Sequence, residues 1–198
     1  MSRSFAVWFG LGGLSLALIA GCPGPENGTP TPVAIAGTWS GTLTCTSIEY
    51  LGELTGTPRT GSRELTITFG DDGLPAALVV WGFSSATDQT ISGNQTGQSE
   101  TFEYTFGDVE IALVVTIAET TYTATSIRVV LDLQYSGGGD ALVQEGTGSM
   151  TIEAELDGDN VSYHAVAEYE IMQTATGLDM TFETGETIEC EGTLTRQQ

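Results

Sequence analysis

Hydrophobic and polar residues alternate with a period of two along most of the chain after residue 37. This alternation places successive side chains on opposite faces of an extended strand and is typical of half-buried β-strands. The alternating segments are rich in Thr, Val, Ile and Tyr, and short runs of Gly, Asp and Asn separate them. The clearest inward-facing rows are Leu65, Ile67 and Phe69; Ile111, Leu113, Val115 and Ile117; Ile127, Val129, Leu131, Leu133 and Tyr135; and Val161, Tyr163, Ala165, Ala167, Tyr169 and Ile171.

Short turns between these segments predict that consecutive strands pair as an antiparallel meander. The pattern indicates about ten strands. We expect an all-β antiparallel up-and-down β-barrel of about 8–10 strands, with a two-sheet β-sandwich as the alternative. The expected strands span residues 37–47, 65–69, 74–83, 99–106, 111–117, 127–135, 142–156, 161–171, 178–183 and 186–196.

Two cysteines near the ends of this region predict how its first and last strands pair. If Cys45 lies opposite Cys190 in an antiparallel pair, large side chains on that face lie opposite small ones. At the ends of the two strands, an aromatic ring then lies opposite a guanidinium group. An exported domain would meet oxidising conditions, in which a Cys45–Cys190 disulfide persists; two buried free thiols are the alternative. The same register pairs Leu43 with Gly192, Gly41 with Leu194 and Trp39 with Arg196.

The first 21 residues have the layout of an export signal. Arg3 supplies an early positive charge, and residues 5 to 20 form an apolar stretch that ends in small residues. This stretch is shorter than the ~20 apolar residues of a membrane-spanning helix. Ile19-Ala20-Gly21-Cys22 resembles the lipobox of bacterial lipoproteins. The resemblance implies cleavage before Cys22 and a diacylglycerol on its thiol; an ordinary signal peptide cleaved near Ala20, or an uncleaved leader, is the alternative.

A short tether is expected between this leader and the β-rich region. Residues 23 to 32 include four prolines and no aliphatic residue, so they cannot bury enough surface to offset their ordering entropy. The predicted organisation is therefore a signal peptide over residues 1–21, a Pro/Gly/Thr-rich tether over residues 22–34 and a single all-β domain over residues 35–198. Lipidation of Cys22 would place the protein in the bacterial cell envelope, with the inner or outer membrane undetermined.

The composition is strongly acidic. All 26 acidic residues follow residue 21, against four arginines and no lysine, which gives that region a formal charge of −22. Nucleic acids and anionic lipid surfaces attract basic patches, so neither is an expected partner. The acidic residues are spread along strands and turns, where they favour solubility and protect sheet edges.

The stretch Gly37-Thr38-Trp39 is similar to the G-x-W motif in the first strand of lipocalin-like (calycin) barrels. Those barrels also carry a basic residue on the last strand that packs across the tryptophan, and Arg196 has the corresponding position. The resemblance implies a cup-shaped pocket for a small apolar ligand, opposite the Trp39 end. We name Trp81 and Tyr163 as ligand-binding candidates. Trp39 and Arg196 are expected to fill the base of the barrel and hold its first and last strands together.

Catalytic and metal chemistry find little support in the sequence, and we expect neither an enzyme nor a cofactor. His164 is the only histidine and is expected on the solvated face, opposite Glu153 or Thr151. Zinc needs three or four ligands, which one histidine does not supply. The acidic turns at residues 70–73 and 157–160 do not fit the usual calcium loop and match the needs of tight hairpins, with weak calcium binding as the alternative. Residues 84 to 99 are expected to form the longest polar loop.

Two functions of different class are consistent with these observations. The first is a lipid-anchored, non-catalytic envelope lipoprotein that binds an apolar or amphipathic small molecule in a lipocalin-like pocket. The second is a structural envelope lipoprotein with a filled barrel, which meets envelope proteins or glycans through its acidic outer face. Bulky residues throughout the inward rows favour a filled interior.

Overall fold

The computed structural model describes residues 34–80, 89–93, 95–106, 109–140, 142–175, 177–178 and 180–198. Cys22, Trp81 and the leader therefore lie outside the described residues. The described residues form eleven strands: β1 (Gly37–Leu51), β2 (Leu54–Thr55), β3 (Arg59–Phe69), β4 (Ala77–Val80), β5 (Gln89–Ser92), β6 (Ser99–Phe106), β7 (Val109–Tyr122), β8 (Ser126–Gly138), β9 (Leu142–Asp157), β10 (Asn160–Ala175) and β11 (Met180–Arg196).

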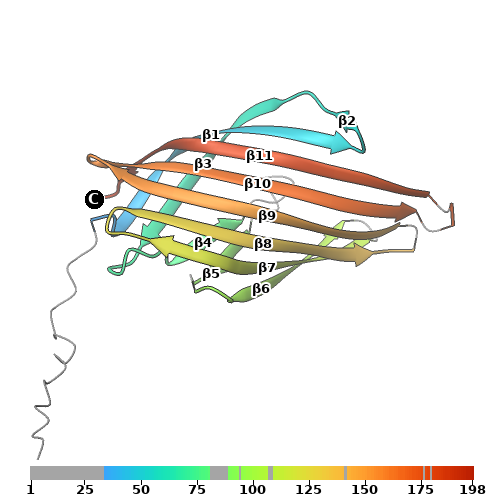
Figure 1. Cartoon of the computed structure of the whole chain (residues 1–198), viewed down its shortest axis with the longest axis horizontal. Helices are drawn as coiled ribbons and strands as arrows, with labels where there is room; N and C mark the ends of the chain where they lie inside the picture. The colour runs from blue at the N-terminus through green and yellow to red at the C-terminus, as the bar shows by residue number, and fades with distance from the viewer. Residues whose placement is uncertain are drawn as a thin grey trace, which may run out of the picture. The chain divides into compact units, whose positions relative to one another are not determined.

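Nine of these strands form one antiparallel sheet that curls into a half-barrel (Figure 1). The sheet runs from β6 through β7, β8, β9, β10 and β11 to β1, and β1 also pairs with β2 and β3. The first and last strands are thus neighbours, although they lie at opposite ends of the domain's sequence. The predicted all-β, up-and-down, barrel-like architecture is confirmed.

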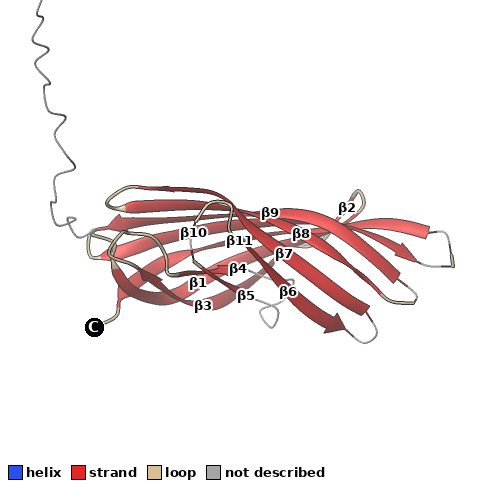
Figure 2. Ribbon diagram, turned by 90° about the horizontal axis from the view of Figure 1, so that it is seen from below, coloured by secondary structure: helices blue, strands red, loops and turns tan. Residues whose placement is uncertain are grey.

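A second sheet contains only β4 and β5. Viewed from below, this hairpin lies between β3 and β6, across the concave side of the large sheet (Figure 2). Leu78, Val80 and Ile91 have at most 1% of their surface exposed and belong to the same hydrophobic core as the large sheet. The hairpin therefore covers the curled sheet because its apolar residues face the concave side.

Two details of the strand prediction were wrong. The segment 84–99 contains β5, because Ile91 is fully buried and Gln89–Ser92 pairs with Ala77–Val80. Residues 178–183 and 186–196 do not form separate strands. Instead, β11 continues without a break through residues 184–185, since Thr184 pairs with Ile171 and Gly185 pairs with Glu170 on β10.

The acidic turns connect strands and stabilise the local backbone. The turn at residues 157–160 joins β9 to β10, and its Gly158 has φ of +63°, a left-handed conformation that glycine adopts readily. In the turn after β3, Asp72 accepts a hydrogen bond from the backbone N–H of Leu74 at 3.0 Å. Among the described residues, no group of three or more His, Cys, Asp or Glu side chains gathers as metal ligands would.

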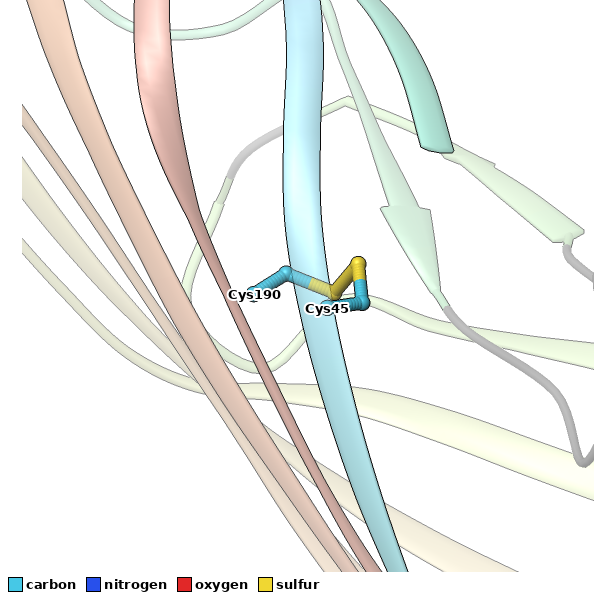
Figure 3. The surroundings of a disulfide bond; sticks show 2 residues. All are labelled: Cys45 and Cys190. Carbon is cyan, nitrogen blue, oxygen red and sulfur yellow. A yellow bond between two sulfur atoms is a disulfide. The ribbon is translucent and has the colours of Figure 1, made fainter. Parts of the chain in front are cut away.

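The disulfide between Cys45 and Cys190 is present, and its prediction is confirmed. It joins directly opposed residues of β1 and β11 across 145 positions of sequence (Figure 3). The register predicted for these strands is the observed one, with Trp39 opposite Arg196. Cys190 is fully buried and Cys45 is 7% exposed, so the bridge forms part of the core.

Candidate ligand cavity at the open end of the half-barrel

The two ends of the concave face differ in how they are filled. At one end, which we call the closed end, Trp39, Leu43 and Tyr163 are each at most 2% exposed. The indole N–H of Trp39 donates to the carbonyl of Ile35 at 2.8 Å, so burial leaves this donor satisfied. Arg196 lies over the Trp39 ring, with its guanidinium carbon 4.6 Å from the ring centroid, and donates to the carbonyl of Ala34 at 2.9 Å.

The opposite end of the concave face, which we call the open end, is lined by smaller and more polar inward residues. On β9, the inward row changes from Met150 and Ile152 to Gly148, Gly146 and Gln144. Tyr169 lies opposite Gly148, and its ring meets that of Tyr135 edge to face, with the centroids 5.6 Å apart. The aromatic pair thus packs where the glycines leave room, and the fully packed core ends near this level.

A cavity of about 570 Å³ opens beyond this level. This volume lies within the range of about 300–1,000 Å³ typical of small-molecule sites. Aliphatic side chains provide much of its wall, and a few polar groups lie among them. The lining includes the aliphatic residues Leu51, Leu54, Ile111 and Ile171 and the polar residues Glu49, Gln144, Gln173, Thr184 and Glu186.

Two carboxylates from neighbouring strands meet at this cavity. Glu49 on β1 and Glu186 on β11 are direct cross-strand partners. Glu186 is only 8% exposed, whereas the Glu49 side chain is 55% exposed. Both residues follow the alternation that places Cys45 and Cys190 on the inward face, and each lies four residues nearer the open end than the cysteine on its own strand.

Several groups set the charge state of Glu186. Burial raises the pKa of its carboxyl group, and the neighbouring Glu49 carboxylate raises this pKa further. A hydrogen bond from Ser47 and the positive charges of Arg63 and Arg59 act in the opposite direction and lower it. Burial is the largest of these effects, so the net pKa lies above the usual value for a glutamic acid.

The two arginines belong to an adjoining, smaller pocket of about 240 Å³. Arg59 and Arg63 line it together with Ser47, Ile188 and Glu186. Arg59 also forms an ion pair with Glu49, with Nη1 3.0 Å from Oε1, but its side chain is 72% exposed. Glu186 therefore lines both spaces, the pocket that contains the two arginines and the aliphatic cavity.

Tyr163, a sequence-predicted ligand residue, lies at the closed end of the half-barrel. It is 2% exposed and pairs with Gly192 on β11 and Ala154 on β9, and the cavity lining does not include it. Burial raises the pKa of Tyr163, which keeps its phenol protonated. Burial and the neighbouring Tyr169 likewise raise the pKa of Tyr135.

Sequence reasoning missed Glu49 and Glu186. The register that places Cys45 opposite Cys190 also places Glu49 opposite Glu186, so the signal was present in the same two strands. An acidic residue in an inward-facing row is unusual because burying a carboxylate is unfavourable without compensation. This exception in the alternation was the feature that could have identified the open end.

The convex face carries the single histidine. His164 is the cross-strand partner of Glu153, and its Nε2 lies 3.0 Å from Oε1 of Glu189. Arg128 pairs with the same Glu153 at 3.3 Å and with Glu119 at 3.7 Å. All of these side chains are at least 40% exposed, which makes them a solvated row of charged and polar groups across the five strands β7 to β11.

Comparisons with known proteins identify no relatives. No protein-family model matches the chain, and neither the curated proteins nor the solved structures yield a match. The described part of the chain contains no helix with the length and apolar character needed to cross a membrane. Functional inference therefore depends on the cavity and its residues.

Proposed function

We propose that the protein is a non-catalytic binding module that takes an apolar or amphipathic small molecule into the cavity at the open end. The observation that carries this proposal is a space of about 570 Å³ with aliphatic walls and a few polar groups. Aliphatic walls remove the apolar part of a ligand from water, and each buried methylene contributes about 0.8 kcal/mol. The polar groups at Glu49, Gln144 and Glu186 would orient the ligand's polar end.

The leader sequence favours a location of this binding module in the bacterial cell envelope. By its resemblance to a lipobox, Cys22 would carry the lipid that anchors the protein in a bacterial cell envelope. Two or more acyl chains anchor a protein stably, whereas one chain binds a membrane only marginally. Metabolic labelling with a tagged fatty acid tests this anchor: the wild type should take up the label, and Cys22→Ser should not. Label that persists in Cys22→Ser would rule the anchor out.

Titration with Nile red, a neutral apolar fluorophore, tests the cavity. The full chain should raise and blue-shift its emission in a saturable way. Gln173→Trp fills the cavity from β10 and should weaken binding by about tenfold, which corresponds to ~1.4 kcal/mol. Met172→Trp is a matched control, because Met172 is the next residue on the same strand and faces the convex side, 44% exposed. Equal binding by both variants, or no saturable binding by the wild type, would contradict the proposal.

A second function, contact with another envelope component, is favoured by the apolar side chains near the open end. Leu54 and Leu178 are 71% and 70% exposed, and Met180 is 58% exposed. Exposed apolar groups that gather in one region often mark interaction sites. Cross-linking in intact cells from a photoreactive residue at position 178, compared with one at position 155 on the convex face, tests this function. A discrete cross-linked product from position 178 alone would support it.

A further inference from the structure

The cavity combines aliphatic walls with carboxylates, and this combination identifies the class of ligand. We propose that its occupant is an amphiphilic cation, with an amine or guanidine head group that pairs with Glu186 and Glu49. This inference rests on the proposed binding function and adds the sign of the ligand's charge. Three features of the molecule support it: the placement of charge around the cavity, the burial of Glu186 and the charge of the whole domain.

The placement of charge favours a positive head group. Among the described residues that line the cavity, Glu49 and Glu186 are charged acids and none is basic. Arg59 and Arg63 line the adjoining pocket of about 240 Å³. The Arg59–Glu49 ion pair leaves more than half of each side chain exposed, so water screens it and its net contribution is small. A cation in the cavity would reach Glu186 from a space that neither arginine lines.

Burial makes Glu186 the stronger of the two candidate partners. Glu186 is 8% exposed as a residue, and a charged partner compensates for lost hydration of a carboxylate more effectively at a buried site than at an exposed one. The Ser47 hydroxyl provides one hydrogen bond and leaves the carboxylate with further acceptor capacity. An ammonium or guanidinium group has several N–H donors, whereas a carboxylate head group has none.

The whole domain attracts the same class of ligand. The region after residue 21 has a formal charge of −22, and a field of one sign raises the local concentration of oppositely charged ligands. This long-range effect is independent of any single residue. It must therefore be separated experimentally from pairing within the cavity.

The titratable and charged groups that face Glu186 define the pH dependence. Glu49 faces it from β1, Arg59 and Arg63 from β3, Tyr169 from β10 and Tyr135 from β8. Burial raises the pKa of Glu186 in the free protein, and a bound cation favours the ionised form. The affinity for a cation should consequently rise as the pH rises through the pKa of Glu186, while the affinity for a neutral ligand should not.

Displacement of Nile red by three amphiphiles with the same chain, used below their micelle concentrations, tests the inference. These are decylammonium, decanol and decanoate. Decylammonium should displace the probe at a concentration about tenfold lower than decanol, and decanoate should be the weakest competitor. Glu186→Gln should remove most of the preference for decylammonium over decanol. Glu155→Gln is the matched control, because it removes one charge from an exposed position on the convex face of β9.

The outcomes distinguish this inference from the proposed function. Displacement by all three compounds at similar concentrations would overturn the inference and leave the binding function standing. A preference for decylammonium that Glu186→Gln and Glu155→Gln reduce equally would also overturn it, because long-range attraction alone would then account for the preference. Failure of every compound, together with no binding of Nile red, would overturn both.

Discussion

Glu49 and Glu186 face each other directly across β1 and β11, on the concave face of the sheet. Like charges in this arrangement are unfavourable, and Glu186 is also buried. The domain therefore keeps a destabilising pair at the edge of its cavity. Residue pairs that lower the stability of the fold are commonly retained where a protein binds a ligand.

The first prediction concerns the pH dependence of this pair. Burial raises the pKa of Glu186 in the folded protein, so the carboxyl group favours folding when it is protonated. That contribution is fully present below the pKa of the unfolded chain, about 4.3. It is lost as the pH rises through the higher folded pKa.

Glu186→Gln removes this titration and should increase the free energy of unfolding at pH 7 relative to the wild type. The gain should shrink as the pH falls below the unfolded pKa. Urea denaturation at pH 4 and pH 7 measures it, with Glu155→Gln as an exposed control that should change stability much less. A Glu186→Gln variant less stable than the wild type at pH 7 would show that the pairing with Ser47 and Arg63 outweighs burial.

The second prediction concerns the Cys45–Cys190 disulfide. The bridge closes a loop across 145 positions of sequence and joins the first and last long strands of the sheet. The chain-entropy model gives a stabilisation of about 5 kcal/mol for a loop of this length. A Cys45→Ala/Cys190→Ala double variant should lose about 3–5 kcal/mol in the free energy of unfolding. Denaturation with and without reductant measures this loss.

Reductant should lower the stability of the wild type and leave the double variant unchanged. This comparison separates the bridge from the packing of two buried sulfur atoms. If the wild type were insensitive to reductant even when unfolded and refolded in its presence, the bridge would contribute nothing to the stability of the fold.

The third prediction concerns the inward glycines near the open end. A Cβ added at Gly148 would lie 2.5 Å from the carbonyl oxygen of Glu168 and 3.1 Å from Cδ1 of Tyr169. The backbone oxygen cannot move without disturbing the sheet. Gly148→Ala should therefore lower the free energy of unfolding by about 1–3 kcal/mol. Thermal or urea denaturation measures the change.

Gly61 provides a matched control on β3, because nothing lies within 4 Å of a Cβ added there and its φ is not in the left-handed region. Gly61→Ala should be neutral or stabilise the protein by up to about 1 kcal/mol, since alanine reduces the freedom of the unfolded chain. If both variants lost the same stability, the close approach at Gly148 would not be the cause.

The sequence predicted the pairing of β1 with β11 correctly because two local constraints agreed there. Alternation fixed which face each residue of these strands occupies, and only one register satisfied both the cysteines and the large-to-small packing. The inward rows of β7, β8 and β10 were predicted for the same reason. Each has an unbroken period of two over at least four residues, and the structure buries nearly all of their members.

Features that depend on tertiary contacts were harder to predict. The strand β5 has one strongly apolar residue, Ile91, in a polar segment, so its pairing with β4 depends on burial against the large sheet. The end of β11 next to its turn was predicted as a separate strand, whereas the pairing of Thr184 and Gly185 with β10 makes β11 continuous. Trp81 and Tyr163 were the predicted ligand residues; Trp81 lies outside the described residues, and Tyr163 does not line the cavity, which lies where β9 changes from large residues to glycines.

The last prediction concerns the closed end, where Arg196 covers the Trp39 ring and donates to the carbonyl of Ala34. An exposed cation–π contact is worth about 0.5–1 kcal/mol, and a hydrogen bond from a charged donor adds to it. Arg196→Ala should consequently lower the free energy of unfolding by about 1–2 kcal/mol. Arg196→Lys should recover part of this loss, because lysine keeps the charge but lacks the planar group that stacks on the ring.

Arg128 is the matched control for this measurement. It also spans neighbouring strands, but its contacts are ion pairs to Glu153 and Glu119 on the solvated convex face. Arg128→Ala should cost less than about 0.5 kcal/mol, as exposed ion pairs usually do. Equal losses for the two alanine variants would mean that net charge, rather than stacking on Trp39, accounts for the contribution of Arg196. A larger loss for Arg196→Ala that high salt leaves unchanged would assign it to the contact with the ring and the Ala34 carbonyl, because salt screens exposed ion pairs.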